Sequence, residues 1–453
     1  MPSNAPPPLP PAETPRELAV AVVRRLTEAG HRALFAGGCV RDTLLGRPAK
    51  DFDVATSAKP DEVRALFRRT LAVGAAFGVI CVLEEKVPQE RAPRQIEVAT
   101  FRSDGAYTDG RRPDSVQFTT EVEDVKRRDF TINGLLYDPL KDEVLDYVGG
   151  RDDLARKVVR AIGDANARFA EDRLRMLRAV RFAAAFGFEL DSATRDAIRA
   201  SASHVLQVSP ERIREELVKM LTGPRPRQAF ELLESTGLLA AVLPEVAALK
   251  GVEQPPEFHP EGDVWTHTLL LLGQLENASA TLALGALLHD IGKPATFQKA
   301  DRIRFNDHEK VGAALAEELL RRLKFSNDDL TRICALVKQH MTFKDVKQMR
   351  MATLKKFMRQ PHFSEHLELH RLDCLACHKN LANYEFVKQK LGETAASQLR
   401  PKPLLSGDDL QALGFTPGPQ LGKIIAALEE EQLEGRLDSP EAARAWVCAT
   451  FLK

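Results

Sequence analysis

The sequence is poor in aromatic residues other than phenylalanine. It contains 2 Trp and 4 Tyr beside 22 Phe, and aromatic residues make up 6% of its 453 positions. Proteins that bind single-stranded nucleic acids by base stacking rely on aromatic side chains. The composition therefore argues against a stacking platform as the main means of binding.

The sequence also lacks a net charge. Its 64 Lys and Arg residues balance 64 Asp and Glu residues, so the formal net charge is zero at pH 7. Affinity for phosphates depends on the charges at the contact and not on the whole chain. Any nucleic-acid site must therefore be a local basic stripe.

Disulfide, export and membrane signals are lacking as well. The six cysteines are scattered, which does not indicate a disulfide framework. Residues 1–15 are rich in Pro and Ala without a basic start or an apolar core, so we expect a disordered lead-in and no signal peptide. No apolar run approaches the length that spans a bilayer. These absences predict a reduced, cytoplasmic compartment and no membrane partner.

What remains is a globular, multidomain composition. Hydrophobic residues make up 44% and charged residues 28%, and the length suggests about three domains. Strand-like segments alternate with short helices up to residue 150, and helical patterns dominate beyond it. The predicted parts are an α/β head (16–150), an all-α neck (151–250), an all-α body (251–400) and a C-terminal tail (401–453).

Two carboxylates share one predicted strand in the head. The strand runs from Asp51 to Ala55, and Asp51 and Asp53 are two positions apart, so both side chains leave the same face. Adjacent carboxylates disfavour joint ionisation unless a cation lies between them. Hard oxygen ligands suit Mg²⁺, which also holds substrate phosphates. Taken alone, the pattern also fits a solvated strand end.

A glycine turn precedes this strand. Gly37 and Gly38 let the backbone approach a phosphate closely, and the predicted helix that follows offers its positive N-terminus. Arg41 adds a guanidinium fork for phosphate oxygens. Together with the carboxylates, this turn makes a site for Mg²⁺ and phosphate the better interpretation.

The segment LFAGGCVRDTLLGRPAKDFDVAT (34–56) resembles the signature of class II nucleotidyltransferases, the family of CCA-adding enzymes and bacterial poly(A) polymerases. The resemblance implies a polymerase-beta-like head. It implies that Asp51 and Asp53 are catalytic and hold two Mg²⁺ ions, one at the RNA 3′-hydroxyl and one at the leaving pyrophosphate. Glu97, on a predicted strand over residues 95–101, is either a third carboxylate near these ions or a surface residue.

A second segment, KRRDFTIN (126–133), resembles the sugar and phosphate motif of the same family. The resemblance implies that Arg128 contacts the triphosphate or ribose, and that Asp129 and Asn133 contact the ribose hydroxyls. Taken alone, the segment also fits a basic dipeptide at the start of an ordinary helix.

A third segment, EDRLRMLRAVR (171–181), places Asp172, Arg175 and Arg178 at three-residue steps on one helix face that Arg181 continues. An acceptor beside a donor fork complements the Watson–Crick edges of C and A and mismatches those of G and U. A helix with ordinary surface salt bridges is the competing interpretation. The stretch resembles the base-selecting motif of the family, which implies that Asp172 and Arg175 select the base. Arg178 and Arg181 are then expected to hold the nucleotide or the helix.

The next segment, SPERIREELVKML (209–221), also resembles a family motif, and we expect Arg212 and Glu215 to be structural ties. Basic residues in and after it form the predicted stripe for tRNA. They are Arg214, Lys219, Arg225 and Arg227.

The sequence lacks two features of bacterial poly(A) polymerases, which favours the CCA-adding enzymes of the same family. The stretch VGAAFGV (73–79) lacks the Gly-Arg-Arg-Phe element usual in bacterial poly(A) polymerases, and no long basic tail follows the body. The predicted function is therefore template-independent addition of CMP and AMP, from CTP and ATP, to the 3′ end of tRNA. The alternatives are poly(A) synthesis, addition of CC alone or A alone, and an RNA-binding phosphohydrolase with an inactive head.

The body carries a spaced set of histidines and aspartates around LLHDIGKPATF (287–297), which resembles the HD-type metal-dependent phosphohydrolases. Imidazole and carboxylate ligands suit a divalent transition metal more than Mg²⁺. The resemblance implies four ligands: His267, His289, Asp290 and Asp373. His308 and His340 are expected to complete a second site or bind phosphate. The expected substrates are 2′,3′-cyclic phosphates or terminal monoesters on RNA, and a structural domain without turnover is the alternative.

Overall fold

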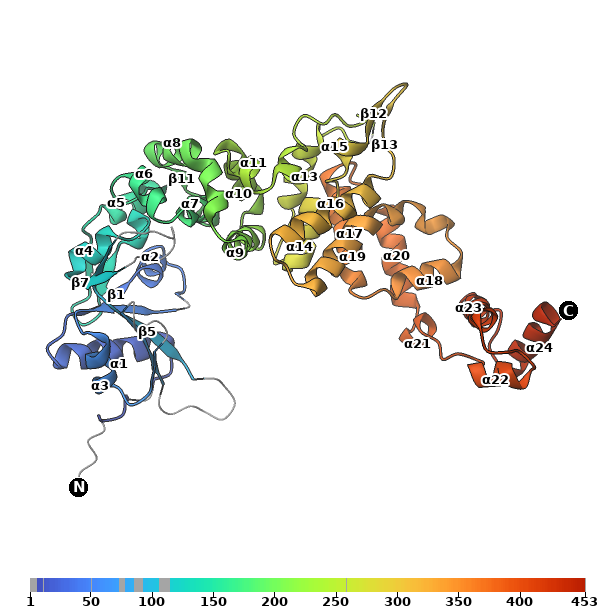
Figure 1. Cartoon of the computed structure of the whole chain (residues 1–453), viewed down its shortest axis with the longest axis horizontal. Helices are drawn as coiled ribbons and strands as arrows, with labels where there is room; N and C mark the ends of the chain where they lie inside the picture. Colours follow the sequence, from blue (N-terminus) through green and yellow to red (C-terminus); the bar gives the residue numbers. More distant parts are fainter. Residues whose placement is uncertain are drawn as a thin grey trace. The chain divides into compact units, whose positions relative to one another are not determined.

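The computed structural model describes residues 6–10, 12–49, 51–72, 78–84, 93–105, 115–257 and 259–452. The chain divides into two compact units, Met1–Pro244 and Glu245–Lys453 (Figure 1). Residues 73–77 of the stretch that separates the family members lie outside the described residues. Within the described ranges, no helix is both long and apolar enough to cross a membrane.

A mixed sheet forms the head of the first unit, with the strand order β3-β4-β5-β2-β1-β8-β9. The strands are Thr70–Leu71 (β3), Val79–Leu83 (β4), Gln95–Thr100 (β5), Asp53–Thr56 (β2), Ala33–Ala36 (β1), Leu136–Asp138 (β8) and Glu143–Leu145 (β9). Only β2 and β5 pair in parallel, and the other neighbours are antiparallel. All residues of β1 are buried, as expected for a central strand covered on both faces.

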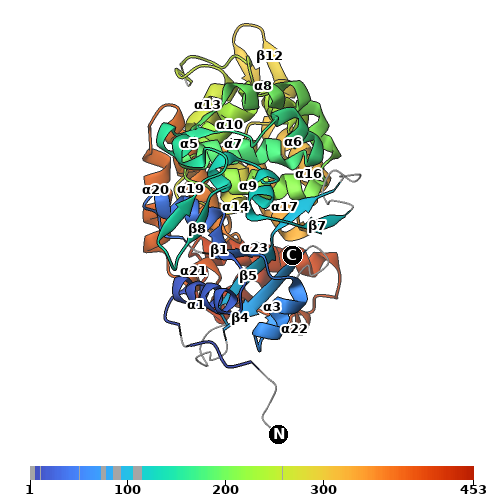
Figure 2. The ribbon, with the colours of Figure 1, turned by 90° about the vertical axis from the view of Figure 1, so that its left-hand side faces the viewer.

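Helices of the head surround this sheet. They are Pro15–Glu28 (α1), Gly38–Leu44 (α2), Pro60–Leu66 (α3) and Glu121–Lys126 (α4), with a 3₁₀ turn at Thr131–Asn133 (η2) and a hairpin of Arg102–Asp104 (β6) and Val116–Phe118 (β7). Thr14 and Glu17 form a capping box that starts α1. The apolar side of α1 packs on β1, β2 and β5 (Figure 2). The segment KRRDFTIN begins at Lys126, the last residue of α4, so its basic residues lie at the end of a helix and not at the start of one.

Part of the expected disordered lead-in lies against α1. The two terminal nitrogens of Arg25 donate to the carbonyl oxygens of Pro7 and Pro8, each at 2.7 Å. Leu9 is buried beside them.

Strand β2 begins at Asp53 and not at Asp51. Its antiparallel partner β1 ends at Ala36, opposite Asp53, because Gly37 turns the chain away at a φ of +72°. Asp51 thus precedes the ladder, yet the alternation holds, since Phe52 is buried and both carboxylates reach the surface.

The neck is helical except for one short parallel pair, Val158–Val159 (β10) with Glu189–Leu190 (β11), so the expected all-α neck is corrected. Its helices are Gly150–Arg156 (α5), Ala165–Glu171 (α6), Leu174–Phe186 (α7), Ser192–Ser201 (α8), Pro210–Leu221 (α9), Pro226–Ser235 (α10) and Leu238–Val242 (α11), with a 3₁₀ segment at Ala202–Gln207 (η3). The pair forms where the chain enters and leaves α6 and α7, because both extended segments need backbone partners there.

The second unit is built around α14, whose residues from Thr281 to Leu288 are all buried. The helices of the unit are Val264–Leu272 (α13), Ala280–Leu288 (α14), Lys293–Thr296 (α15), His308–Arg322 (α16), Asn327–Gln339 (α17), Met351–Met358 (α18), Phe363–Ala376 (α19), Ala382–Glu393 (α20) and Ala396–Leu399 (α21), with a 3₁₀ segment at His340–Gln348 (η4); the short α12 (Pro244–Ala247) spans the boundary. A hairpin of Phe297–Lys299 (β12) and Ile303–Phe305 (β13) corrects the expected all-α body. The Arg304–Asp301 ion pair, at 2.9 Å, braces its turn.

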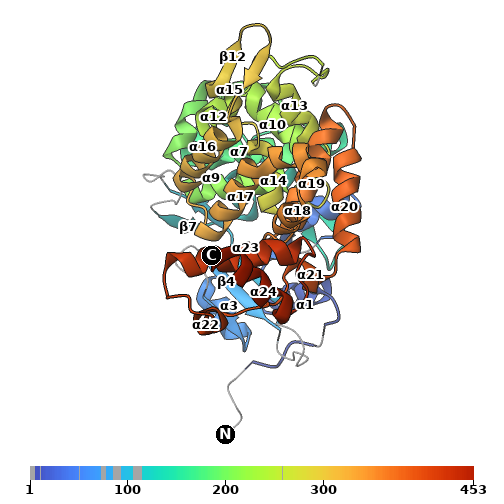
Figure 3. The same ribbon diagram turned by 90° about the vertical axis from the view of Figure 1, so that its right-hand side faces the viewer.

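The tail folds onto α18 (Figure 3). It consists of Gly407–Ala412 (α22), Pro419–Leu433 (α23) and Pro440–Phe451 (α24). Arg359 pairs with Glu429 at 2.7 Å, and Lys355 donates to the carbonyl of Leu433 at 2.8 Å. Polar contacts therefore tie the tail to the body.

Candidate functional sites in the two units

Two other carboxylates lie near enough to Asp53, at one end of the head sheet, to act on its charge. The parallel register of β2 and β5 places Asp53 opposite Glu97, and Asp51 lies two residues before Asp53. Partial burial and the charges of Glu97 and Asp51 raise the pKa of Asp53 to about 6. A divalent cation between these oxygens would relieve the repulsion, so the residues present fit a metal site. Sequence patterns had left the position of Glu97 open.

The glycine turn lies beneath two guanidinium groups. A Cβ atom on Gly37 would lie 3.3 Å from Nη1 of Arg128, and one on Gly38 would lie 3.5 Å from Nη2 of Arg41. The charge of Arg128 also lowers the pKa of Asp53, which places it near the carboxylates. Bare backbone beside two fixed cations can accommodate a polyphosphate next to the metal ligands.

Four of the predicted nucleotide-binding residues form one hydrogen-bonded chain. Arg41 Nη1 donates to Asn133 Oδ1 at 2.6 Å, and Asn133 Nδ2 donates to Asp129 Oδ1 at 3.0 Å. Arg178 Nε and Nη2 both donate to Asp129 Oδ2, at 2.9 and 2.6 Å. Although burial opposes it, the charge of Arg178 lowers the pKa of Asp129. In this conformation, Asp129 and Asn133, the side chains expected to bind ribose, are hydrogen-bonded to other protein groups.

Two phenylalanines that the sequence patterns did not single out complete this region. The Arg181 guanidinium carbon lies 4.1 Å from the centroid of Phe182, and that of Arg41 lies 4.5 Å from the centroid of Phe186. Arg178 also lies over Phe182, at 5.3 Å. The signal in the sequence is the four-residue spacing of Arg178, Phe182 and Phe186, which places all three on one face of α7. These rings fix the guanidinium planes.

Asp172 and Arg175 do not share a helix face. Asp172 lies between α6 and α7, where its Oδ1 accepts from the Leu174 backbone at 3.0 Å. The helix breaks because this carboxylate satisfies an N–H group that the first turn of α7 leaves free. Arg175 Nη1 donates to Glu171 Oε2 at 2.6 Å. The single continuous helix expected here is wrong.

Of the two structural contacts expected in the neck, the one at Arg212 is present, and the one at Glu215 is not found among the described residues. Arg212 pairs with Asp172 at 2.8 Å, whereas Arg181 pairs with Glu216 at 2.5 Å. Glu216 is buried and Glu215 is exposed, so the tie expected at Glu215 belongs to its neighbour. The members of the predicted stripe that are exposed are Lys219, Arg225 and Arg227.

The second site begins with a trio of ligand groups from α13, the end of α14 and α19. Nε2 of His267 lies 3.3 Å from Nε2 of His289 and 3.1 Å from Oδ1 of Asp373. All three ligand atoms lie within 4.8 Å of one another. This spacing fits a single metal ion.

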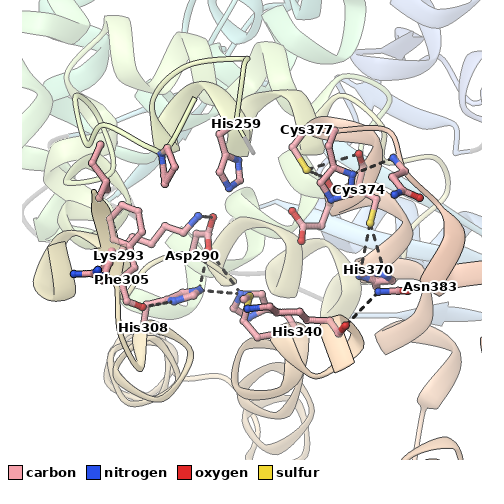
Figure 4. Close-up of a pocket in the computed structure, with 18 residues that line it drawn as sticks. His259, Asp290, Lys293, Phe305, His308, His340, His370, Cys374, Cys377 and Asn383 are labelled. Carbon is pink, nitrogen blue, oxygen red and sulfur yellow. Dashed lines mark hydrogen bonds and ion pairs between the residues drawn. The ribbon is translucent and has the colours of Figure 1, made fainter. Parts of the chain in front are cut away.

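A second trio lies beside the first. Nε2 of His308 lies 3.2 Å from Nε2 of His340 and 3.5 Å from Oδ1 of Asp290 (Figure 4). The other oxygen of Asp290 lies 3.2 Å from Nε2 of His289, in the first trio. The carboxylate of Asp290 thus presents one oxygen to each trio. All six predicted residues are brought together.

Every imidazole in this cluster is oriented by a hydrogen bond from its other nitrogen. The acceptors for Nδ1 are Glu261 Oε1 for His267 (2.9 Å), the Ala286 carbonyl for His289 (2.9 Å), the Phe305 carbonyl for His308 (2.9 Å) and the Val337 carbonyl for His340 (2.6 Å). Such contacts leave the Nε2 lone pairs for a metal.

The pKa values of the cluster also fit a cation. Burial and the neighbouring His289 lower the pKa of His340 to about 3, so this ligand is neutral at pH 7. Against the effect of burial, Asp373 and Glu261 raise the pKa of His267 to about 9. A positive charge is therefore favoured where the first trio converges, and a metal can replace the proton.

Four residues of the cluster line a cavity of about 760 Å³ (Figure 4): Asp290, His308, His340 and Asp373. Lys293, Arg304 and Lys344 are among its lining residues. Lys293 Nζ lies 2.7 Å from Asp290 Oδ2 and donates to Gln254 Oε1 at 2.6 Å. Cationic groups beside a metal cluster suit a phosphate ester.

Comparison with known families assigns a family to the head, the neck and the body. The family described as "Poly A polymerase head domain" matches residues 33–160, and the one described as "Probable RNA and SrmB- binding site of polymerase A" matches residues 187–250. The HD domain family matches residues 263–373.

Curated relatives and a solved structure agree with these matches. A CCA-adding enzyme of Lactiplantibacillus plantarum is 33% identical over 91% of this chain and 90% of its own length. One from Geobacillus thermodenitrificans is 44% identical over 51% of this chain, and the match spans 56% of that relative, about half of its length. The crystal structure of the Bacillus stearothermophilus CCA-adding enzyme in complex with CTP has a TM-score of 0.71, with 26% identity, over 97% of this chain and 98% of that one.

Proposed function

Because the chain belongs to the family of CCA-adding enzymes, we propose that it adds CMP and AMP, from CTP and ATP, to the 3′ end of tRNA. The observation that carries the proposal is that Asp51 and Glu97 both raise the pKa of Asp53, which lies opposite Glu97 in the sheet and follows the glycine turn. Template-independent addition needs a metal site, a polyphosphate site and a protein surface that reads the base, and the head and neck supply candidates for each.

In this proposal, Arg41 and Arg128 hold the triphosphate above Gly37. Asp51 and Asp53 hold divalent cations, which we take to be Mg²⁺. When bound, the cations supply activation of the RNA 3′-hydroxyl and neutralise charge on the leaving pyrophosphate. Glu97 adds negative charge beside Asp53 and strengthens cation binding there.

The base is read by Asp172 and Arg175. The carboxylate accepts from the exocyclic amino group of C or A, and the guanidinium donates to the ring nitrogen. An incoming base competes with the present partners of these side chains, Arg212 and Glu171. The exposed stripe on α9 and α10 binds tRNA phosphates.

The test is incorporation into tRNA that lacks its 3′ end, with labelled CTP and ATP supplied alone and together. We expect two C residues from CTP alone and completion by a single A when both are present. Asp53→Asn should abolish incorporation, and Asp290→Asn, in the other unit, should leave it unchanged. Loss of incorporation in Asp290→Asn, or its survival in Asp53→Asn, would overturn the assignment.

We propose a phosphohydrolase as a second activity, carried by the two trios of the HD domain. His267, His289 and Asp373 hold one divalent transition metal, and Asp290 with His308 and His340 holds another. The cavity suits a nucleotide-sized group, and the substrate class is a 2′,3′-cyclic phosphate or terminal monoester on RNA. Hydrolysis of 2′,3′-cyclic AMP by the Mn²⁺- or Co²⁺-loaded chain should vanish in Asp290→Asn and persist in Asp53→Asn.

We place the enzyme in the cytoplasm. All six cysteines are free thiols, a state that a reducing compartment maintains.

A further inference from the structure

Glu261 joins two histidines at the edge of the HD cluster. Its Oε1 accepts from Nδ1 of His267 at 2.9 Å and from Nδ1 of His259 at 2.9 Å. The two rings meet edge to face, with centroids 5.2 Å apart. His267 belongs to the first trio, whereas His259 belongs to neither trio.

This arrangement fixes the tautomer of both rings. A carboxylate oxygen can only accept, so Nδ1 carries the hydrogen in His259 as well as in His267. The remaining nitrogen of a neutral imidazole, Nε2, then presents a lone pair. In His267 that lone pair faces the metal position, 3.1 Å from Asp373 Oδ1.

Nε2 of His259 is on a ring that lines the cavity. His259 lines the cavity together with Asp290 and Lys293, and its ring projects into it in Figure 4. Within the described part of the chain, its side chain hydrogen-bonds through Nδ1 only. The nitrogen is thus an acceptor without a protein donor, beside the metal position.

The burial of the Glu261 carboxylate destabilises the fold unless a nearby positive charge compensates for it. Its side chain is only 7% exposed, and Oε2 has no hydrogen-bond partner among the described residues. A half-satisfied buried carboxylate is unfavourable unless it serves a cationic centre. The carboxylate is therefore better explained by the metal site than by packing.

We propose that Glu261 is a positioning residue of the HD centre that orients His267 as a metal ligand. Glu261 also holds the ring of His259. Nε2 of His259 then accepts a hydrogen bond from the water that attacks the phosphate ester. The role of His259 rests on the proposed phosphohydrolase. The role of Glu261 rests only on the geometry of the ligand it orients.

The full chain, stripped of metal, is titrated with Co²⁺, and hydrolysis of 2′,3′-cyclic AMP is then measured. Glu261→Ala should weaken Co²⁺ binding by about 10- to 100-fold. Glu261→Gln retains the acceptor oxygen and should recover most of that affinity. His259→Phe should bind Co²⁺ as the unchanged chain does, with kcat lowered by about 10²-fold and KM little changed.

Glu257→Ala is the matched control, because it removes an exposed carboxylate from the same loop and should change neither quantity. Unchanged Co²⁺ affinity in Glu261→Ala would overturn the role of Glu261, and unchanged kcat in His259→Phe would overturn that of His259. If the Co²⁺-loaded chain hydrolyses no ester, the phosphohydrolase and the role of His259 both fail. The Co²⁺ affinities would still decide the role of Glu261.

Discussion

At the scale of single residues, the carboxylates of the head repel one another when no cation is bound. The pKa of Asp53 is raised to about 6, so the folded chain holds this proton more tightly than the unfolded chain does. Between the ordinary value of about 4 and this raised value, the free energy of unfolding therefore falls as the pH rises. Above that window, Asp53 is fully ionised and its repulsion is greatest.

Protons and Mg²⁺ compete for Asp53, so Mg²⁺ should stabilise the chain more at pH 7.5 than at pH 5. The measurement is thermal unfolding at both pH values with and without Mg²⁺. In Asp53→Asn the increment should be small at both. An equal increment at both pH values in the unchanged chain would contradict the raised pKa.

The ion pair between the buried Asp129 and the partly exposed Arg178 gives a second expectation. Arg178→Met leaves one oxygen of the buried Asp129 carboxylate without its partner, which should lower the free energy of unfolding by about 1–3 kcal/mol. Urea denaturation measures this loss. The double variant with Asp129→Asn should recover much of it, and failure to do so would mean that the two side chains act independently.

At the scale of elements, the break between α6 and α7 presents Asp172 and Arg175 from different segments. Arg175→Ala should relax discrimination against UTP and GTP by about tenfold or more, since a mismatched base no longer meets an opposing donor. Single-turnover incorporation of each nucleotide measures the ratio. Arg173→Ala, whose guanidinium donates to the Phe169 carbonyl, should keep the original ratio.

The sequence predicted the elements whose signals are local. The central strand at Ala33–Ala36 has such a local signal, because its four apolar residues end at a glycine turn. Asp172 was assigned to a helix, because the pattern of charges cannot show that its carboxylate caps the following one. The hairpin at residues 297–305 was missed, since each strand has only three residues and half of the six are polar or charged.

The candidate sites depended on contacts between distant segments. Motif resemblance identified the six HD residues, but the partners of their Nδ1 atoms are mostly backbone carbonyls, which no side-chain pattern reveals. The position of Glu97 follows from the parallel pairing of β2 and β5, and that register is set by tertiary packing.

At the scale of the whole molecule, the two compact units carry separate sites. Calorimetry of the full chain should resolve two transitions, because each unit contains a core of its own. CTP with Mg²⁺ should raise one transition, and Co²⁺ should raise the other. Asp373→Asn should remove only the Co²⁺ response. A single transition that responds to both ligands would show that the units unfold together.

The bond between Asp129 and Arg178 has a consequence for protein engineering. It joins residues 49 positions apart, one from the head and one from α7 of the neck, and both belong to the same compact unit. A chimera that takes its head from one relative and its neck from another must therefore inherit both side chains as a matched set. Exchange boundaries are better chosen near Pro244, where one compact unit ends and the next begins.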